Sequence, residues 1–83
     1  MRYCLRIEVN LKTGHSDPEG ETTAGVLNDL GYEVVAVRIG KVYKVLVEAD
    51  SQRDAESKAD EMCKRLLANP TKDDYSISVE EMR

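Results

Sequence analysis

The sequence predicts an α+β fold in which strands and helices follow one another in the order βαββαβ. Apolar and polar residues alternate over residues 3–11 and again over 74–82, which is typical of strands with one buried face. Between them, two segments that begin with helix-capping residues flank the apolar stretch 33–50. This order indicates a ferredoxin-like layout: a four-stranded antiparallel sheet with both helices on one face.

A first helix is expected to begin at Asp17, the N-cap, with Pro18 at the first helical position, where its missing N–H costs nothing. Glu19 and Glu21 suit the positive end of the helix dipole, and Gly31 ends the helix. Two internal glycines weaken it, so it depends on packing or allows another backbone to approach closely. Its expected inner stripe consists of Thr23, Val26, Leu27 and Leu30.

The second helix has stronger local signals. Ser51 begins an S-x-x-D variant of the capping box, and Asn69-Pro70 stops the helix. Three acid-before-base pairs at i,i+4 spacing each add about 0.2–0.5 kcal/mol. These pairs are Asp54–Lys58, Asp60–Lys64 and Glu61–Arg65. The apolar stripe consists of Ala55, Ala59, Met62, Cys63, Leu66 and Leu67.

The stretch 33–50 is expected to contain two strands that form a hairpin around Gly40. A two-residue turn would place a lysine on the inner face. A three-residue connection, Gly40-Lys41-Val42, instead sets Ile39 opposite Tyr43 and restores one apolar face. We therefore predict the longer connection.

The outer face of that hairpin is also partly apolar. Val34 and Ala36 lie on the second strand, which is an edge strand in a ferredoxin-like sheet, and Leu46 lies on the third. An exposed apolar edge strand tends to associate with another chain. The sequence thus predicts self-association or a protein partner, with Val34, Ala36 and Leu46 as the candidate dimer face.

Length and composition limit the function. The 83 residues are expected to form one domain over 1–83, and the net charge of −4 with four tyrosines as the sole aromatics argues against a nucleic-acid binder. No apolar run is long enough to span a bilayer, and Met1-Arg2-Tyr3 leads directly into alternation rather than into a signal peptide. We expect a cytoplasmic protein with no membrane partner and reduced thiols.

No catalytic constellation is expected. His15 is the single histidine and lies in a loop rich in turn residues, so a metal site is not favoured. Cys63 falls on the apolar stripe of the second helix, and Cys4 has no base nearby. Arg38 and Lys41 form a basic turn that either is solvated or contacts an anion or a partner. We predict no catalytic, cofactor-binding or metal-ligating residue in this chain.

Three short motifs resemble the PurS family when taken together in this order. They are "SDPEG" at residues 16–20, "VRIGK" at 37–41 and "MCKRLLANPTKDDY" at 62–75. The resemblance covers essentially the whole chain. It implies that residues of these motifs contact partner proteins, namely Asp17, Pro18, Glu19, Gly20, Arg38, Gly40, Lys41, Asn69 and Pro70.

PurS is the small subunit of phosphoribosylformylglycinamidine (FGAM) synthase, so the resemblance implies a non-catalytic assembly subunit in purine biosynthesis. In that complex the glutaminase subunit PurQ releases ammonia, and the synthetase subunit PurL uses ATP and Mg²⁺ to activate formylglycinamide ribonucleotide. The expected partners are a second copy of the chain, PurL and PurQ. The chain itself is expected to bind no cofactor.

Two alternatives share the βαββαβ order. An ACT-like amino-acid-binding module would require a glycine-rich loop between the first strand and first helix, where Gly14 is the single glycine before Asp17. An acylphosphatase-like enzyme would require an arginine in a phosphate-binding loop, and "KTGHS" at residues 12–16 contains none.

Overall fold

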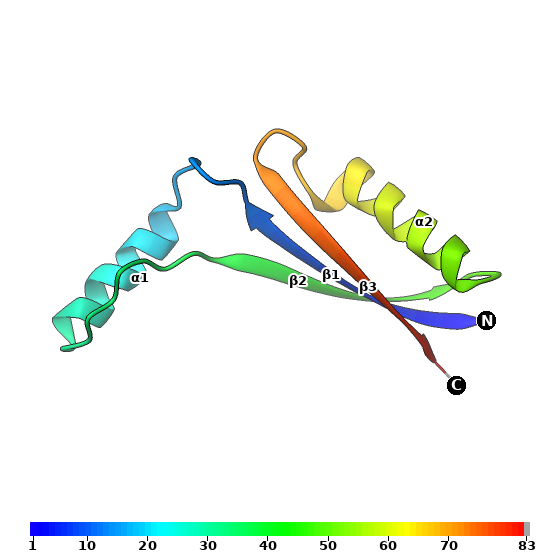
Figure 1. Cartoon of the computed structure of the whole chain (residues 1–83), viewed down its shortest axis with the longest axis horizontal. Helices are drawn as coiled ribbons and strands as arrows, with labels where there is room; N and C mark the ends of the chain where they lie inside the picture. Colours follow the sequence, from blue (N-terminus) through cyan, green and yellow to red (C-terminus); the bar gives the residue numbers. More distant parts are fainter. Residues whose placement is uncertain (83) are drawn as a thin grey trace.

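Three antiparallel strands form the centre of the protein in the computed structural model, which describes residues 1–82 (Figure 1). β1 (Arg2–Leu11) lies between β2 (Gly40–Glu48) and β3 (Asp73–Met82). Alternate side chains of β1 are buried on one face, as the alternation predicted, and those of β2 and β3 extend that face on either side. The expected four-stranded sheet is therefore a three-stranded one.

α2 (Gln52–Met62) covers this apolar face, where it packs against β1 and β3. It begins as predicted, since the Ser51 hydroxyl accepts a hydrogen bond from the Asp54 N–H at 3.1 Å. The three predicted i,i+4 ion pairs form, at 2.6, 2.8 and 3.1 Å. The smallest side chains of the stripe, Ala55 and Ala59, are fully buried together with Cys63, which lets the helix lie close to the sheet.

The end of this helix differs from a regular α-helix. The turn η1 (Cys63–Leu67) is π-helical, and the Ala68 N–H donates to the Cys63 carbonyl at 3.0 Å. A π-turn adds one residue per turn and rotates the following side chains away from the α-helical stripe. Leu66, predicted to be in the core, is consequently 82% exposed.

α1 (Pro18–Asp29) begins at Asp17 and is followed by Gly31 with a φ of 100°, both as predicted. Its position differs from the prediction, because α1 projects beyond the end of the sheet and does not lie beside α2 (Figure 1). Val26 and Leu30 of the expected inner stripe are 53% and 68% exposed. The expectation that both helices cover one face of the sheet is wrong for this chain taken alone.

The predicted strand over 33–39 is extended but pairs with no strand of the described residues. Instead it returns along α1, and two side chains hold its backbone. Asn28 of α1 accepts from the Val34 N–H at 3.1 Å, and the N-cap residue Asp17 accepts from the Ile39 N–H at 2.8 Å. Gly40 then enters β2 directly, opposite Asn10. The predicted hairpin at Gly40-Lys41-Val42 is absent, because the backbone of 33–39 is held by α1.

We refer to residues 17–39, comprising α1 and the returning extended segment, as the arm. The arm gives the chain an elongated shape of 51 × 29 × 14 Å. The radius of gyration is 16.3 Å, whereas a compact domain of this length has about 12 Å. The fold thus consists of a half-covered sheet and an arm that leaves it.

Candidate functional site: a cleft formed by three motifs

The three motifs meet in space at the end of the sheet where β1 ends and β2 and β3 begin. They surround a cleft of about 310 Å³, which we call the motif cleft. Its lining residues come from the sheet, the arm, η1 and the turn into β3, and comprise Val9, Leu11, Asp17, Glu19, Ile39, Gly40, Lys41, Leu67, Asn69, Lys72 and Asp73. Motifs more than 40 residues apart in the chain therefore form one surface.

Asp17 joins the arm to this cleft and is 7% exposed. One carboxylate oxygen accepts from the Gly20 N–H at 2.9 Å and caps α1, while the other accepts from the Ile39 N–H at 2.8 Å. The Ile39 N–H, followed by the Gly20 N–H, holds the pKa of the Asp17 carboxyl below its ordinary value, against the opposing effect of burial. Asp17 thus fixes the start of α1 to the start of β2.

Two motif glycines allow close approach of neighbouring atoms. A Cβ at Gly20 would collide with the Val37 carbonyl oxygen of the returning segment. A Cβ at Gly40 would collide with the Asn10 side chain and lie 3.1 Å from the Val9 carbonyl oxygen. Gly40 does not have a positive φ, so the structure requires a glycine there for space and not for a turn.

Arg38 stabilises the loop between β1 and α1. Its guanidinium donates to the carbonyl oxygens of Leu11 and Lys12 at 3.3 Å each and of His15 at 3.4 Å. The Arg38 guanidinium is therefore engaged in hydrogen bonds within its own chain. Lys41, the other basic residue of this motif, forms no ion pair within residues 1–82 and lines the cleft.

The third motif forms the turn into β3. The Asn69 side-chain oxygen accepts from the Thr71 N–H at 2.9 Å, and the Asn69 N–H donates to the Asp73 carboxylate at 2.9 Å. Five predicted contact residues line the motif cleft, namely Asp17, Glu19, Gly40, Lys41 and Asn69. The other four, Pro18, Gly20, Arg38 and Pro70, belong to the same motifs but do not line it.

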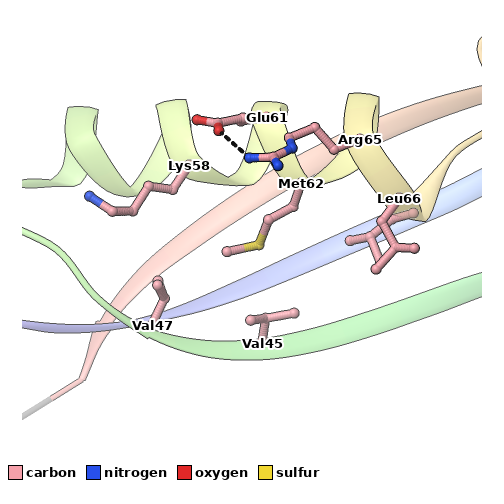
Figure 2. Close-up of a pocket in the computed structure, with 8 residues that line it drawn as sticks. Val45, Val47, Lys58, Glu61, Met62, Arg65 and Leu66 are labelled. Atoms are coloured by element: carbon pink, nitrogen blue, oxygen red, sulfur yellow. Dashed lines mark hydrogen bonds and ion pairs between the residues drawn. The ribbon is translucent and has the colours of Figure 1, made fainter.

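A second, more apolar depression lies between α2 and β2 and has a volume of about 520 Å³. We call it the α2 groove. Figure 2 shows Val45 and Val47 of β2 on one side of it and Met62 of α2 pointing toward them from the other. Lys58, Glu61, Arg65, Leu66 and Leu67 complete its lining. The groove was not predicted, because both helices were expected to cover this face of the sheet.

The candidate dimer face is divided between two parts of the molecule. Val34 is half-buried and Ala36 exposed on the returning segment of the arm, whereas Leu46 is exposed on β2. No hairpin turns the chain between them, so Val34 and Ala36 do not lie beside Leu46 of the same chain.

The two cysteines are both free thiols. Cys63 is fully buried, and this burial raises the pKa of its thiol, which suppresses the reactive thiolate. No group of three metal-ligating side chains gathers within the described residues, and His15 lies half-buried in its loop. None of the helices described for residues 1–82 has the length and apolar character needed to cross a membrane.

The chain is a small α+β protein. Its main features are a half-covered sheet, a projecting arm and a cleft where three motifs meet, all of which are surfaces suited to contact with other proteins. Comparison with known proteins gives the family. Residues 4–81 match the family model "PurS: Phosphoribosylformylglycinamidine (FGAM) synthase". The chain belongs to the PurS family, and PurS is a subunit of FGAM synthase in purine biosynthesis.

A curated relative and two solved structures agree with this assignment. The PurS subunit of Archaeoglobus fulgidus is 44% identical over 72 residues, covering 86% of this chain and 90% of the relative. The Thermus thermophilus PurS structure has a TM-score of 0.89 at 39% identity and covers all of both chains. The structure of PurLQS from Thermotoga maritima contains a chain with a TM-score of 0.88 at 30% identity, covering 96% of this chain and 99% of that one.

Proposed function

We propose that this chain is the non-catalytic assembly subunit of FGAM synthase, acting in the cytoplasm as one domain that helps to join the glutaminase and synthetase subunits for ammonia transfer. It does so as a self-associated subunit, with Val34, Ala36 and Leu46 in the contact between copies. The PurLQS structure of the Thermotoga maritima relative supports an assembly of this kind. An ACT-like ligand-binding module is not favoured, because the relatives are PurS subunits.

The observation that carries the proposal is the convergence of three separate motifs on the motif cleft. Its backbone is held by the Asp17 carboxylate and by the Asn69 turn, so the surface is pre-organised. Lys41 lines this surface with a charge that pairs with no acid in the described chain. A pre-organised surface with an available charge is well suited to recognise a complementary protein surface.

The division of labour follows from the chemistry of the reaction. ATP phosphorylates the amide oxygen of formylglycinamide ribonucleotide, and ammonia from glutamine then displaces phosphate to give the amidine. ATP and Mg²⁺ belong to the synthetase subunit in this proposal, and glutamine belongs to the glutaminase subunit. The present chain binds neither and keeps the two sites joined so that ammonia passes between them.

Reconstitution with PurL and PurQ of the same organism tests the proposal. Product formation is measured with glutamine and, separately, with ammonium chloride. The chain should increase the glutamine-dependent rate and leave the ammonium-dependent rate nearly unchanged. Assayed alone with glutamine, ATP and the ribonucleotide, it should release neither glutamate nor ADP; turnover by the pure chain would contradict the proposal.

Lys41→Glu tests the motif cleft within the same assay. A reversed charge at a desolvated contact should weaken the complex by about tenfold or more, equivalent to about 1.4 kcal/mol. Lys44→Glu is the matched control, because Lys44 is exposed on the same strand but does not line the cleft. Equal affinity of both variants for PurL and PurQ would place the contact elsewhere.

A further inference from the structure

Basic side chains without an acidic partner gather at one end of the sheet. Basic residues elsewhere in the chain mostly form ion pairs, namely Arg2, Arg6, Lys58, Lys64 and Arg65. Those that lie where β1 ends and β2 and β3 begin form none within residues 1–82, namely Lys12, Arg38, Lys41 and Lys72. Most of the positive charge that no acid of the described chain neutralises therefore lies around the motif cleft.

Lys41 has an unusual position on β2. It lies opposite Val9 of β1, so it belongs to the same inward-facing row as Tyr43, Val45 and Val47. Val9 is buried, whereas Lys41 is exposed and lines the cleft. A lysine at the end of an apolar row covers apolar surface with its stem and keeps its ammonium group at the rim. The Lys41 ammonium is therefore available at the mouth of the cleft.

Lys72 lines the cleft from the opposite side. Its backbone is held in the turn into β3, where its N–H donates to the Asn69 carbonyl at 3.1 Å and its carbonyl accepts from the Lys12 N–H at 2.7 Å. β1 separates β2 from β3, which places these two strands about 9–10 Å apart. Lys41 and Lys72 thus line one cleft from two sides, with the end of β1 between them.

The acidic residues of the cleft do not neutralise these two lysines. Both Asp17 oxygens accept from backbone N–H groups, and one oxygen of Asp73 accepts from the Asn69 N–H. Glu19 lies in the first turn of α1, where the helix dipole favours a carboxylate. None of the three acids forms an ion pair within residues 1–82. Two ammonium groups therefore line one space without a carboxylate of this chain bound to either.

We propose that the motif cleft receives an acidic side chain of a partner subunit, whose carboxylate lies between the ammonium groups of Lys41 and Lys72. Charge-assisted hydrogen bonds from both lysines stabilise this carboxylate. Val9, Leu11 and Leu67 provide a floor on which an apolar residue beside the acid packs. The inference rests on the proposed function and specifies the chemistry of the contact.

The size of the cleft agrees with this occupant. Its volume of about 310 Å³ is at the lower limit of the clefts that hold small ligands, about 300–1,000 Å³. It accepts one or two side chains and not a whole helix or strand. Small pockets that hold a few anchoring side chains supply much of the binding energy at protein interfaces. One acidic residue with an apolar neighbour is an anchor of this kind.

Carbodiimide cross-linking tests the contact directly, because the reagent joins an amine to a carboxylate that touches it, with loss of water, as an amide. The chain is mixed with PurL and PurQ of the same organism, and cross-linked peptides are identified by mass spectrometry. An amide between Lys41 or Lys72 and an aspartate or glutamate of PurL or PurQ is expected. Lys44 is the control, because it is exposed on β2 but does not line the cleft.

The outcomes distinguish this inference from the proposed function. If the three proteins form an active complex and neither cleft lysine is cross-linked above the level of Lys44, the acidic contact is wrong and the proposed function stands. If no complex forms, the proposed function fails and the inference fails with it. Binding of millimolar inorganic phosphate to the isolated chain, without a cross-link to either subunit, would make the cleft a small-anion site and would also overturn the proposal.

Affinity measurements provide an independent test. Lys41→Gln combined with Lys72→Gln should raise the Kd for the cross-linked subunit by about tenfold or more and make the Kd less dependent on salt, because salt screens ionic contacts. Lys41→Arg combined with Lys72→Arg keeps both charges and should bind nearly as well as wild type. Both lysines are exposed, so circular dichroism should be unchanged. Wild-type affinity and salt dependence in the double glutamine variant would overturn the proposal.

Discussion

Single residues in this protein determine where whole segments lie, and Asp17 is the clearest example. Its two carboxylate oxygens accept from the N–H groups of Gly20 and Ile39, at opposite ends of the arm. A neutral carboxyl group accepts such bonds less well than a carboxylate, which is why these N–H groups lower the pKa of Asp17. The position of the arm is therefore linked to the ionisation of one buried side chain.

We predict that Asp17 makes the protein sensitive to acid. Its pKa in the folded chain is below the ordinary 3.8, so its contribution to stability is fully present well above pH 3.8 and is lost as the pH falls toward the folded pKa. Asp17→Asn should be less stable than wild type near neutral pH and should lose less of its remaining stability between pH 5 and pH 3. Melting temperatures across this range measure both effects.

Asp74→Asn is the control for this comparison, because Asp74 is an exposed residue of β3. Wild type also carries Asp54 and Asp60, whose pKa values are lowered by Lys58 and Lys64, so the acid response of the whole protein is larger than that of Asp17 alone. The quantity to compare is the fall in melting temperature between pH 5 and pH 3 in Asp17→Asn and in Asp74→Asn. Parallel melting curves for Asp17→Asn and Asp74→Asn would show that the arm does not depend on the carboxylate.

At the scale of elements, α1 is a helix of low intrinsic stability held by its neighbours. Gly20 and Gly25 both lie inside it, and a glycine inside a helix costs about 1 kcal/mol relative to alanine. Their surroundings differ, because a Cβ at Gly20 would collide with the Val37 carbonyl oxygen while a Cβ at Gly25 has nothing within 4 Å. The first glycine allows the returning segment to lie against the helix, and the second has no such role in the single chain.

Alanine at these two positions should have opposite effects. Gly25→Ala should stabilise α1 by about 0.5–1 kcal/mol. Gly20→Ala should displace the returning segment, so the Ile39 N–H should exchange with solvent about tenfold faster. Circular dichroism and amide exchange of Ile39 measure the two outcomes. Unchanged exchange in Gly20→Ala would mean that the segment is not held against the helix in solution.

The elements could be predicted where their signals are local. The cap at Ser51, the i,i+4 pairs of α2 and the alternation of β1 involve residues a few positions apart, and the structure confirms all of them. The lack of a hairpin at Gly40 and the π-turn at Cys63 could not be predicted, because both depend on which distant groups satisfy the backbone. Alternation over 33–39 indicates an extended chain but does not identify its partner.

The same limit applies to the motif cleft. The resemblance to PurS identified Asp17, Lys41 and Asn69 as contact residues, but their meeting at one cleft follows from the register of β1 with β2 and β3. The role of Arg38 could not be predicted from the sequence either, since its three carbonyl acceptors lie more than 20 residues away in the chain. Motifs identify the residues of a surface, and the fold determines which of them face outward together.

At the scale of the whole molecule, an elongated chain with an uncovered groove has less buried apolar surface than its length allows. The radius of gyration of 16.3 Å reflects an arm that contacts little of its own sheet. Small domains depend on most of their apolar residues being buried. The proposed association of two copies would cover part of this exposed apolar surface.

The last prediction concerns the candidate dimer face. If segment 33–39 of one copy runs antiparallel to β2 of the other, in the register predicted for the hairpin, Ala36 of one chain lies opposite Leu46 of its partner. Two glutamates at this position would be like charges directly across two strands, which is destabilising. Ala36→Glu combined with Leu46→Glu should thus sediment as a folded monomer at concentrations where wild type is a dimer, and glutamine-dependent synthesis with PurL and PurQ should fall.

Ala36→Lys combined with Leu46→Glu is the matched variant, since it places opposite charges at the same two positions and should restore the dimer. The two double variants alter the same positions and differ in the sign of one charge. A general effect of polarity or of lost packing would weaken the dimer to a similar extent in both double variants. A direct contact between the two positions would weaken the dimer of the glutamate pair and not that of the lysine–glutamate pair. If both variants remain dimers with full activity, Ala36 and Leu46 do not meet between copies, and the outer edge of β2 is not part of the interface.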